Sequence, residues 1–264
     1  MLYDYTSLLT PLRKEGGRLM LEAKRIESED NLKEKGDPAN LVTVYDVAVQ
    51  RLLINGITAT LPGATFIAEE KDNTPESAEA EHCFVIDPID GTANFTRGFN
   101  HSCISVGVIS RGVTVYGAVY DPYLDEMFTA ELGGGTRVNG IPVRPSEHDA
   151  AHSVIIFGTS PYYKQTLGKR TFAVVEELYG SCADLRRTGT AALDLAYIAA
   201  GRADGFIELI LSPWDFVAGS LLVREAGGVI TDLEGNVPKG TSPSPIIAGT
   251  TKIHKLILDT ARRN

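Results

Sequence analysis

Two aspartates three positions apart, Asp87 and Asp90, stand between an apolar segment and the sequence Gly-Thr-Ala-Asn. The apolar run at 83–86 predicts a buried strand, and Gly-Thr-Ala-Asn suits the start of a helix. Carboxylates at a strand end that face the N–H groups of a helix start would form a joint site for a cation and a phosphate. Because Asp-Pro is commonly a turn and Asp before Gly-Thr a helix cap, a purely structural role stays open.

Two further acids occupy similar positions. Glu69 ends the short apolar segment Phe-Ile-Ala, and Asp215 directly follows the only tryptophan at the start of an apolar helix. Each also has an ordinary structural explanation: Glu-Glu-Lys at 69–71 as a solvated charge run, and Asp215 as a cap that favours the helix dipole.

Composition indicates an ordinary globular protein. The chain has 264 residues, of which 43% are hydrophobic and 22% charged, enough for one large domain or two compact ones. No stretch approaches the ~20 apolar residues that cross a bilayer, and no signal peptide is recognised. The cysteines at 83, 103 and 182 are scattered and odd in number. We therefore expect a cytoplasmic protein without disulfides or membrane partners.

The formal net charge of −9 limits the partners. A chain this acidic is a poor candidate for binding a nucleic acid polymer. An enzyme that acts on phosphates would also repel its substrate, unless bound cations neutralise the acids.

The hydrophobic pattern changes along the chain. Helical spacing covers 5–27 and 46–61, around a polar segment at 27–40 that we expect to be a mobile loop. Short strand-like runs then indicate a mostly antiparallel sheet at 65–68, 83–86, 103–110, 113–120 and 126–130. After Arg144 strands and helices alternate, as in an α/β protein, at 153–157, 162–179, 184–188, 190–200, 205–208, 214–225, 228–231, 245–248 and 252–262. We predict two halves, 1–145 and 146–264.

Several segments together resemble one family, the inositol monophosphatases, which are metal-dependent, lithium-sensitive phosphatases. The matching segments are LVTVYD (41–46), EE (69–70), DPIDGTANF (87–95), GTAALDLAYIAAGRADGF (189–206) and WDFVAGSLLVREAGG (214–228). The resemblance implies a layered α-β-α-β-α sandwich of class α+β / α/β. In it, an N-terminal antiparallel sheet carries two helices, a C-terminal α/β half follows, and the site lies between the halves.

The resemblance also implies roles for individual residues. The implied metal ligands are Glu69, Asp87, Asp90, Asp215 and the carbonyl of Ile89. The implied catalytic residues, which position and activate the attacking water, are Glu69, Asp46 and Thr92. The implied substrate contacts are Asp90, Gly91 and Thr92 at the phosphate, and Gly189, Thr190, Ala191 and Glu208 at the leaving group. The sequence departs from the family pattern at Ala68, Ala93, Arg97 and Asn100, none of which is an implied ligand.

The ligand types define the metal. Two like charges ~4 Å apart repel by ~4 kcal/mol at an effective dielectric of 20, so converging carboxylates require a cation. Oxygen ligands without histidine or cysteine point to Mg²⁺ first, with Mn²⁺ as a possible substitute. We expect two or three ions, direct in-line attack by water, and a homodimer, as in most relatives.

The substrate is less well defined. The resemblance favours a small phosphorylated metabolite, with myo-inositol monophosphate first and fructose 1,6-bisphosphate, histidinol phosphate or 3′-phosphoadenosine 5′-phosphate as alternatives. A regulator that binds phosphate esters without hydrolysing them is a remote alternative. Arg186 and Arg187 could meet a second phosphate or form surface ion pairs.

Overall fold

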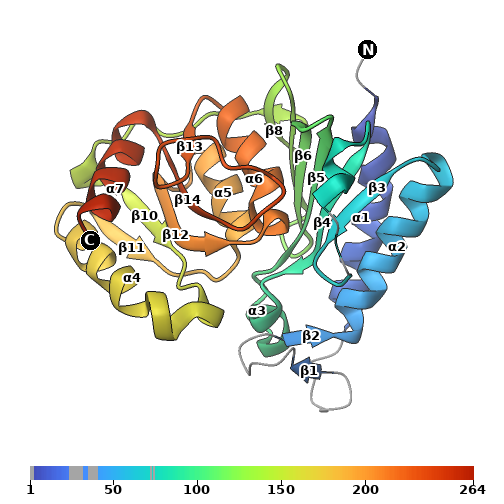
Figure 1. The fold of residues 1–264 in the computed structure, drawn as a ribbon, viewed down its shortest axis with the longest axis horizontal. Coiled ribbons are helices and arrows are strands. Elements are labelled where there is room, and N and C mark those ends of the chain that lie inside the picture. Colours follow the sequence, from blue (N-terminus) through green and yellow to red (C-terminus); the bar gives the residue numbers. More distant parts are fainter. Residues whose placement is uncertain (1–2, 24–31, 35–40, 72, 74) are drawn as a thin grey trace.

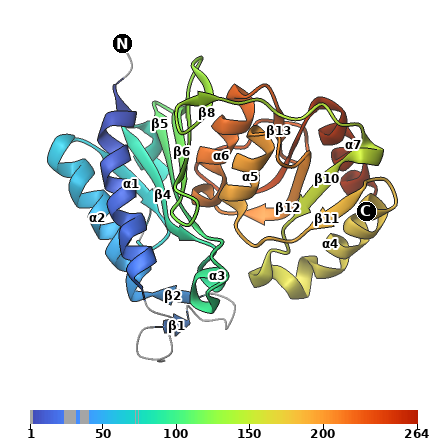
Figure 2. The ribbon, with the colours of Figure 1, turned by 180° about the vertical axis from the view of Figure 1, so that it is seen from behind.

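The architecture consists of alternating layers of helices and sheets (Figure 1). The computed structural model describes residues 3–23, 32–34, 41–71, 73 and 75–264. In this part of the chain, two helices cover the outer face of a first sheet, two lie between the sheets, and two cover the outer face of the second sheet. Figure 2 shows the same order from behind. The expected α-β-α-β-α sandwich is confirmed.

The first sheet is the antiparallel meander expected in the N-terminal half. In spatial order, its described strands are β3 (Thr65–Ala68), β4 (Cys83–Asp90), β5 (Cys103–Ser110), β6 (Val113–Asp121), β7 (Glu126–Glu131), β8 (Gly135–Val138) and β9 (Ile141–Pro142). Neighbours pair antiparallel except β3 and β4, which run parallel. All residues of β4 are buried. The strand that carries both motif aspartates therefore lies inside the sheet.

Two helices, α1 (Tyr5–Glu22) and α2 (Val44–Thr60), cover the outer face of this sheet. A capping box starts α2: the Thr43 hydroxyl accepts from the N–H of Asp46, and the Asp46 carboxylate accepts from the N–H of Thr43 at 2.7 Å. In α1, a Cβ on Gly16 would lie 2.8 Å from Cδ1 of Ile104 in the sheet. Glycine at this position thus allows the helix to pack closely on the sheet.

The second sheet follows the α/β pattern of the C-terminal half. In spatial order, its described strands are β11 (Asp184–Arg186), β10 (Val154–Phe157), β12 (Gly205–Leu211), β14 (Ser244–Gly249) and β13 (Val229–Thr231). β10 runs parallel to β11 and β12, whereas β14 runs antiparallel to β12 and β13. The helices α4 (Lys164–Tyr179) and α7 (Thr251–Arg263) pack on its outer face.

Between the sheets lie α5 (Ala191–Ala199) and α6 (Pro213–Glu225). α6 packs against β5 and β6 at two glycines. A Cβ on Gly117 would lie 2.5 Å from the carbonyl oxygen of Ala218, and one on Gly107 would lie 3.2 Å from the Ala218 nitrogen. The missing side chains let the helix backbone approach the sheet backbone, which places the start of α6 next to β4.

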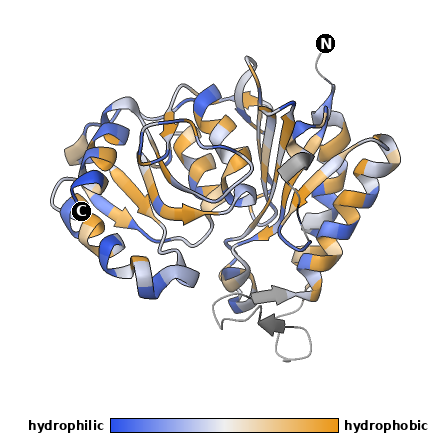
Figure 3. Cartoon of the chain, in the orientation of Figure 1, coloured by the Kyte–Doolittle hydropathy of each residue, from blue (hydrophilic) through white to orange (hydrophobic). Residues whose placement is uncertain are grey.

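Apolar residues concentrate on the strands and on the two middle helices (Figure 3). One buried cluster includes Ile109 of the first sheet, Phe216 of α6 and Ile246 of the second sheet. The chain changes sheets between β9 and β10, an interval that contains the predicted boundary near residue 145. Because one apolar cluster joins both sides, the division into two domains stays a prediction.

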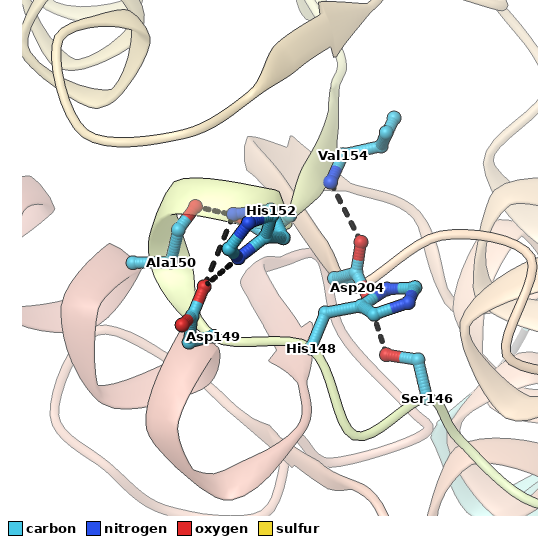
Figure 4. A network of polar contacts seen from close by, with 8 residues as sticks. Ser146, His148, Asp149, Ala150, His152, Val154 and Asp204 are labelled. Carbon is cyan, nitrogen blue, oxygen red and sulfur yellow. Dashed lines mark hydrogen bonds and ion pairs between the residues drawn. The ribbon is translucent and has the colours of Figure 1, made fainter.

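Asp204 anchors the segment that connects the sheets (Figure 4). Its buried carboxylate accepts hydrogen bonds from the Ser146 hydroxyl and, at 2.6 Å, from the main-chain N–H of Val154, and it lies 3.0 Å from Nδ1 of His148. The neighbouring Asp149–His152 pair is separate and exposed. Asp204 thus fixes the path into β10.

Several sequence expectations need correction. The helix expected over 5–27 ends at Glu22, and 24–27 lie outside the described residues. Part of the expected loop at 27–40 is a strand, because β1 (Leu32–Glu34) pairs with β2 (Leu41–Thr43). The rest of that loop, Lys35 included, lies outside the described residues. The strand expected over 184–188 ends at Arg186, where its pairing with β10 stops.

The remaining elements are short. They are α3 (Thr92–Arg97) and the 3₁₀ helices η2 (Pro75–Glu79), η3 (Ala150–His152) and η4 (Pro161–Tyr163). Among the described residues, no helix combines the length and the hydropathy that a membrane crossing requires.

Candidate active site

Three aspartates from two elements meet at one point. Asp87 and Asp90 end β4, and Asp215 lies in the first turn of α6. One carboxylate oxygen of each lies within 4.8 Å of the others. Strand residues three positions apart normally face opposite sides of a sheet, but the β4–β5 register shifts between Asp87 and Asp90. This irregularity allows both side chains to approach Asp215.

Main-chain N–H groups fix the three carboxylates. Asp87 accepts from the N–H of Ile89 at 3.0 Å, and Asp215 accepts from the N–H of Ser212 at 2.8 Å. Asp90 accepts from the N–H of Ala192 at 2.7 Å, a bond between β4 and the first turn of α5. Asp215 therefore does cap its helix, as its structural explanation suggested, and it also belongs to the acidic cluster.

The carboxylates of this cluster repel one another when they are ionised. Burial, followed by the charge of Glu69, raises the pKa of Asp87 well above its ordinary value. Burial likewise raises the pKa of Asp90 to about 7, and burial followed by the charge of Asp90 raises that of Asp215. A cation would favour the ionised forms. Because carboxylate oxygens are the ligands that Mg²⁺ prefers, the cluster fits the predicted metal.

One pocket brings the predicted residues together. It is lined by all of them except Asp46: Glu69, Asp87, Ile89, Asp90, Gly91, Thr92, Gly189, Thr190, Ala191, Glu208 and Asp215. Glu69 directly follows β3, and its N–H donates to the carbonyl of Ile86 on β4 at 3.2 Å. The Glu69 carboxylate does not belong to the group of Asp87, Asp90 and Asp215, whose oxygens lie within 4.8 Å of one another. Glu69 thus lies on the wall beside the cluster.

Asp46 does not line the pocket but lies next to Thr92, which does. The Thr92 hydroxyl is 3.3 Å from Oδ1 of Asp46 and 3.1 Å from the carbonyl oxygen of Ile89. Asp46 is fully buried, and burial raises its pKa to about 6 although the bonds from Thr43 lower it. The structure therefore gives Asp46 access to the pocket through Thr92.

The other side of the pocket comes from the C-terminal half. Oε1 of the buried Glu208 accepts from the N–H of Ser160 at 2.7 Å, and burial raises the pKa of Glu208 to about 7. A Cβ on Gly158 would collide with this carboxylate. Ser160 has a positive φ of 42°. This strained turn carries η4 into the pocket wall, with Glu208 holding its N–H group.

The two halves touch at the pocket through Thr190. Its hydroxyl donates to the carbonyl of His101 at 2.8 Å and lies 3.2 Å from Nδ2 of Asn94, in the first turn of α3. A Cβ on Gly91 would lie 2.4 Å from the Thr190 hydroxyl. With φ at 86°, Gly91 also has a backbone that favours glycine. The motif glycine thus permits close contact between the halves.

A sequence pattern shared by a whole family matches residues 2–264, and its description is "Inositol monophosphatase family". The chain belongs to the inositol monophosphatase family. Similar proteins include one named for transcription and one named for inositol phosphate hydrolysis. "Nus factor SuhB" of Escherichia coli K12 is 39% identical over 251 residues, which cover 95% of this chain and 92% of the relative. "Inositol-1-monophosphatase" of Rhizobium meliloti is 35% identical over 86% of this chain and 84% of the relative.

Solved structures of family members have the same fold. The SuhB protein of Bartonella henselae superposes with a TM-score of 0.89 at 32% identity, covering 99% of this chain and 100% of its own. The IMPase of Thermotoga maritima gives a TM-score of 0.87 at 30% identity, covering 99% and 98%. The family that the sequence motifs indicated is therefore confirmed. Because this family contains phosphatases, membership supports a phosphatase activity for this chain.

Tyr162 and Asp194 are among the residues of the pocket wall that sequence reasoning did not assign, and the roles of two arginines were left undecided. Tyr162 lines the pocket, and burial followed by the charge of Glu69 raises its pKa. Asp194 lines it as a buried carboxylate that accepts from the Thr188 hydroxyl. Tyr162 lies outside the matched motifs, and Asp194 lies in the matched segment 189–206 without an implied role. Arg187 lines the pocket, whereas Arg186 forms an exposed ion pair with Asp184.

Proposed function

We propose that this chain is a magnesium-dependent phosphomonoesterase that acts on small phosphorylated alcohols, with myo-inositol monophosphate as its first expected substrate. The observation that supports this most strongly is the acidic cluster of the buried Asp87 and Asp90 and the partly buried Asp215. Its oxygens lie within 4.8 Å of one another, at the wall of a pocket shared by both halves. The similarity to an inositol-1-monophosphatase supports the choice of substrate.

The proposed ligands of two or three Mg²⁺ ions are Glu69, Asp87, Asp90, Asp215 and the carbonyl of Ile89, with Mn²⁺ as a substitute. When bound, magnesium would neutralise phosphate oxygens and make the attacking water more acidic. Main-chain N–H groups hold the carboxylates of Asp87, Asp90 and Asp215 in place. Such preorganisation lowers the cost of assembling the site.

Thr92, Asp46 and Glu69 are the proposed catalytic residues. The Thr92 hydroxyl can accept a hydrogen bond from water while it donates to Asp46, 3.3 Å away. As the water oxygen bonds to phosphorus, its proton passes through Thr92 to Asp46, whose pKa of about 6 suits a base near neutral pH. Glu69 can orient the same water from the pocket wall. The ester bond breaks on the opposite side, and the departing oxygen takes a proton from solvent.

The remaining residues would bind the substrate. We propose that Asp90 and the N–H groups of Gly91 and Thr92 meet the phosphate, and that Gly189, Thr190, Ala191 and Glu208 meet the alcohol. All of them line the pocket. Glu208 would accept from substrate hydroxyls, because its carboxylate already points into the pocket from β12.

The decisive experiment is phosphate release from a panel of esters with Mg²⁺, with EDTA, and with Mg²⁺ plus Li⁺. The panel contains myo-inositol 1-phosphate, fructose 1,6-bisphosphate, histidinol phosphate and 3′-phosphoadenosine 5′-phosphate. We expect Mg²⁺-dependent, lithium-sensitive release, highest with the inositol ester. Release from another ester alone would change the substrate; release from none would favour the phosphate-binding regulator.

A role in transcription is a second candidate, favoured by the similarity to proteins named Nus factor SuhB. For this reason the expectation of no nucleic-acid partner is not supported. The test compares transcription elongation in vitro with the wild-type chain and with Asp90→Asn. An effect that survives the loss of hydrolysis would establish a separate function, and no effect from either protein would reject it.

We also propose a homodimer in the cytoplasm, as expected from the family resemblance. Sedimentation of the purified chain tests the first point: a mass of twice 28.5 kDa is expected, and a monomer at all concentrations would contradict it. A fluorescent fusion tests the second, with diffuse fluorescence expected.

A further inference from the structure

The pocket contains a positive charge that the proposed reaction does not use. Among the described residues that line the pocket, Arg187 is the only basic one. It stands against six acids: Glu69, Asp87, Asp90, Asp194, Glu208 and Asp215. The metal ions would meet the acids of the cluster, whereas Arg187 lies on the alcohol side, next to Gly189.

The backbone around Arg187 leaves room for its guanidinium. A Cβ on Gly189 would lie 2.1 Å from Nη1 of Arg187, so that no other residue could stand there without moving the guanidinium. Gly189 has a φ of 92°, a conformation that favours glycine. On the other side, Nη2 of Arg187 donates to the Thr159 hydroxyl at 3.1 Å. These contacts hold the guanidinium at the pocket wall.

The charge of Arg187 is not used in an ion pair. In the described part of the chain, no carboxylate lies within 4.0 Å of its side-chain nitrogens, and Glu208 and Asp194 are near enough only for its charge to lower their pKa values. The adjacent Arg186 differs, because it pairs with Asp184 and donates to the carbonyl of Leu185. Arg187 thus offers free N–H donors to the pocket, and a guanidinium binds oxyanions with two parallel hydrogen bonds.

We propose that Arg187 binds a second anionic group on the alcohol part of the substrate. It would thereby favour the phosphate ester of an anionic alcohol over the ester of the matching neutral alcohol, and so extend the range of esters beyond myo-inositol monophosphate. The group is an oxyanion, either a second phosphate or a carboxylate. A neutral polyol would leave the guanidinium without this partner. The inference rests on the proposed phosphatase function and deepens it by assigning a specificity to one residue.

The experiment uses two matched pairs of esters. Glucose 1,6-bisphosphate is compared with glucose 1-phosphate, and 2-phosphoglycerate with glycerol 2-phosphate. The enzyme is the full chain with Mg²⁺, and the readout is the ratio of kcat/KM within each pair. We expect the wild type to favour at least one anionic ester by about 10-fold or more, since a charged hydrogen bond is worth about that factor. The favoured pair tells whether phosphate or carboxylate is the partner.

The variants are Arg187→Gln, Arg187→Lys and, as the matched control, Arg186→Gln. Arg187→Gln should remove the preference, Arg187→Lys should retain part of it, and Arg186→Gln should leave it unchanged. If Arg187→Gln lowers kcat/KM equally for both esters of a pair, or if the wild type has no preference, the inference is wrong. If Arg187→Gln does not fold, the wild-type ratio and Arg187→Lys decide.

The two proposals fail in different ways. Magnesium-dependent hydrolysis of neutral and anionic esters at equal rates rejects the role of Arg187 and keeps the phosphatase. Hydrolysis of none of the four esters, and of none of the esters in the first panel, rejects the phosphatase and the role of Arg187 with it.

Discussion

The carboxylate of Asp90 accepts a hydrogen bond from the main-chain N–H of Ala192 at 2.7 Å, across 102 positions of the sequence. The bond joins the end of β4 to the first turn of α5, and thus the first sheet to the middle helix layer. One oxygen of the proposed metal ligand therefore also connects the two halves of the protein. Because Asp90 has both roles, a substitution there can keep the hydrogen bond that supports folding and remove the charge that catalysis needs.

Asp90→Asn should fold and lose activity. The asparagine carbonyl can still accept from Ala192, while the loss of one negative charge relieves the repulsion among the buried acids. We expect thermal stability without metal to be equal or higher, and kcat to fall by about 100-fold or more, since a metal clamp stabilises the transition state by several kcal/mol. Thermal unfolding and phosphate release measure the two effects. Asp259→Asn, at a half-buried position on α7, is the control, and normal turnover by Asp90→Asn would reject the site.

Magnesium should stabilise the folded chain. A ligand that binds only the folded state at 100 times its Kd adds about 2.7 kcal/mol to the free energy of unfolding. We expect the melting temperature to rise from EDTA to saturating Mg²⁺ in the wild type, and the rise to be much smaller in Asp215→Asn. An equal rise in both proteins would show that the ion binds away from the cluster.

Thr92→Val tests the role of the Thr92 hydroxyl without changing the size of the side chain. Valine keeps the shape but removes the group between Asp46 and the pocket, so we expect kcat to fall by about 100-fold, the usual scale for proton transfer by a positioned group. Thr92→Ser keeps the hydroxyl and should retain most of the activity. Equal activity of the valine and serine variants would exclude the proposed proton path.

Gly117→Ala should damage the site from a distance. The new Cβ would lie 2.5 Å from the carbonyl oxygen of Ala218, which cannot rotate away, so α6 must shift and carry Asp215 with it. Overpacking of this kind costs about 1–3 kcal/mol. We expect a lower free energy of unfolding in urea and weaker Mg²⁺ activation. Gly63→Ala is the control, because nothing lies within 4 Å of a Cβ there.

Glu208→Gln should change how stability depends on pH. Burial raises the pKa of Glu208 from 4.5 to about 7, so the folded state holds the proton more tightly than the unfolded state. The resulting stability is fully present below pH 4.5 and is lost as the pH rises toward 7, by up to about 3 kcal/mol. Glutamine stays neutral and can still accept from Ser160.

The measurement is the melting temperature of wild type and Glu208→Gln between pH 5 and 8. We expect the variant to be more stable at pH 8 and the difference to shrink toward pH 5. The exposed Glu176→Gln should show no such trend. A difference that does not depend on pH would mean that Glu208 is ionised over the whole range.

The sequence by itself determined the layers of the fold and the family. Period-2 and period-3.6 patterns depend on neighbouring residues, so most strands and helices follow from them to within a few positions. Asp87 and Asp90 were found for the same reason, because they follow an apolar strand. Asp215, at the start of an apolar helix, was distinguished from a helix cap only by the family resemblance. Family resemblance added Glu69, Asp46 and Glu208, which local patterns alone could not distinguish from ordinary acids.

Only the tertiary structure decided which side chains share the pocket. Arg186 and Arg187 are adjacent and identical in type, yet one pairs with Asp184 and the other lines the pocket, because β11 ends between them and the chain turns toward Gly189. The short distance between the carboxylates of Asp215 and Asp87, within 4.8 Å, likewise depends on the close packing of Ala218 on Gly117. Such contacts join residues that are far apart in the chain, and their distances follow from backbone packing that local spacing does not specify.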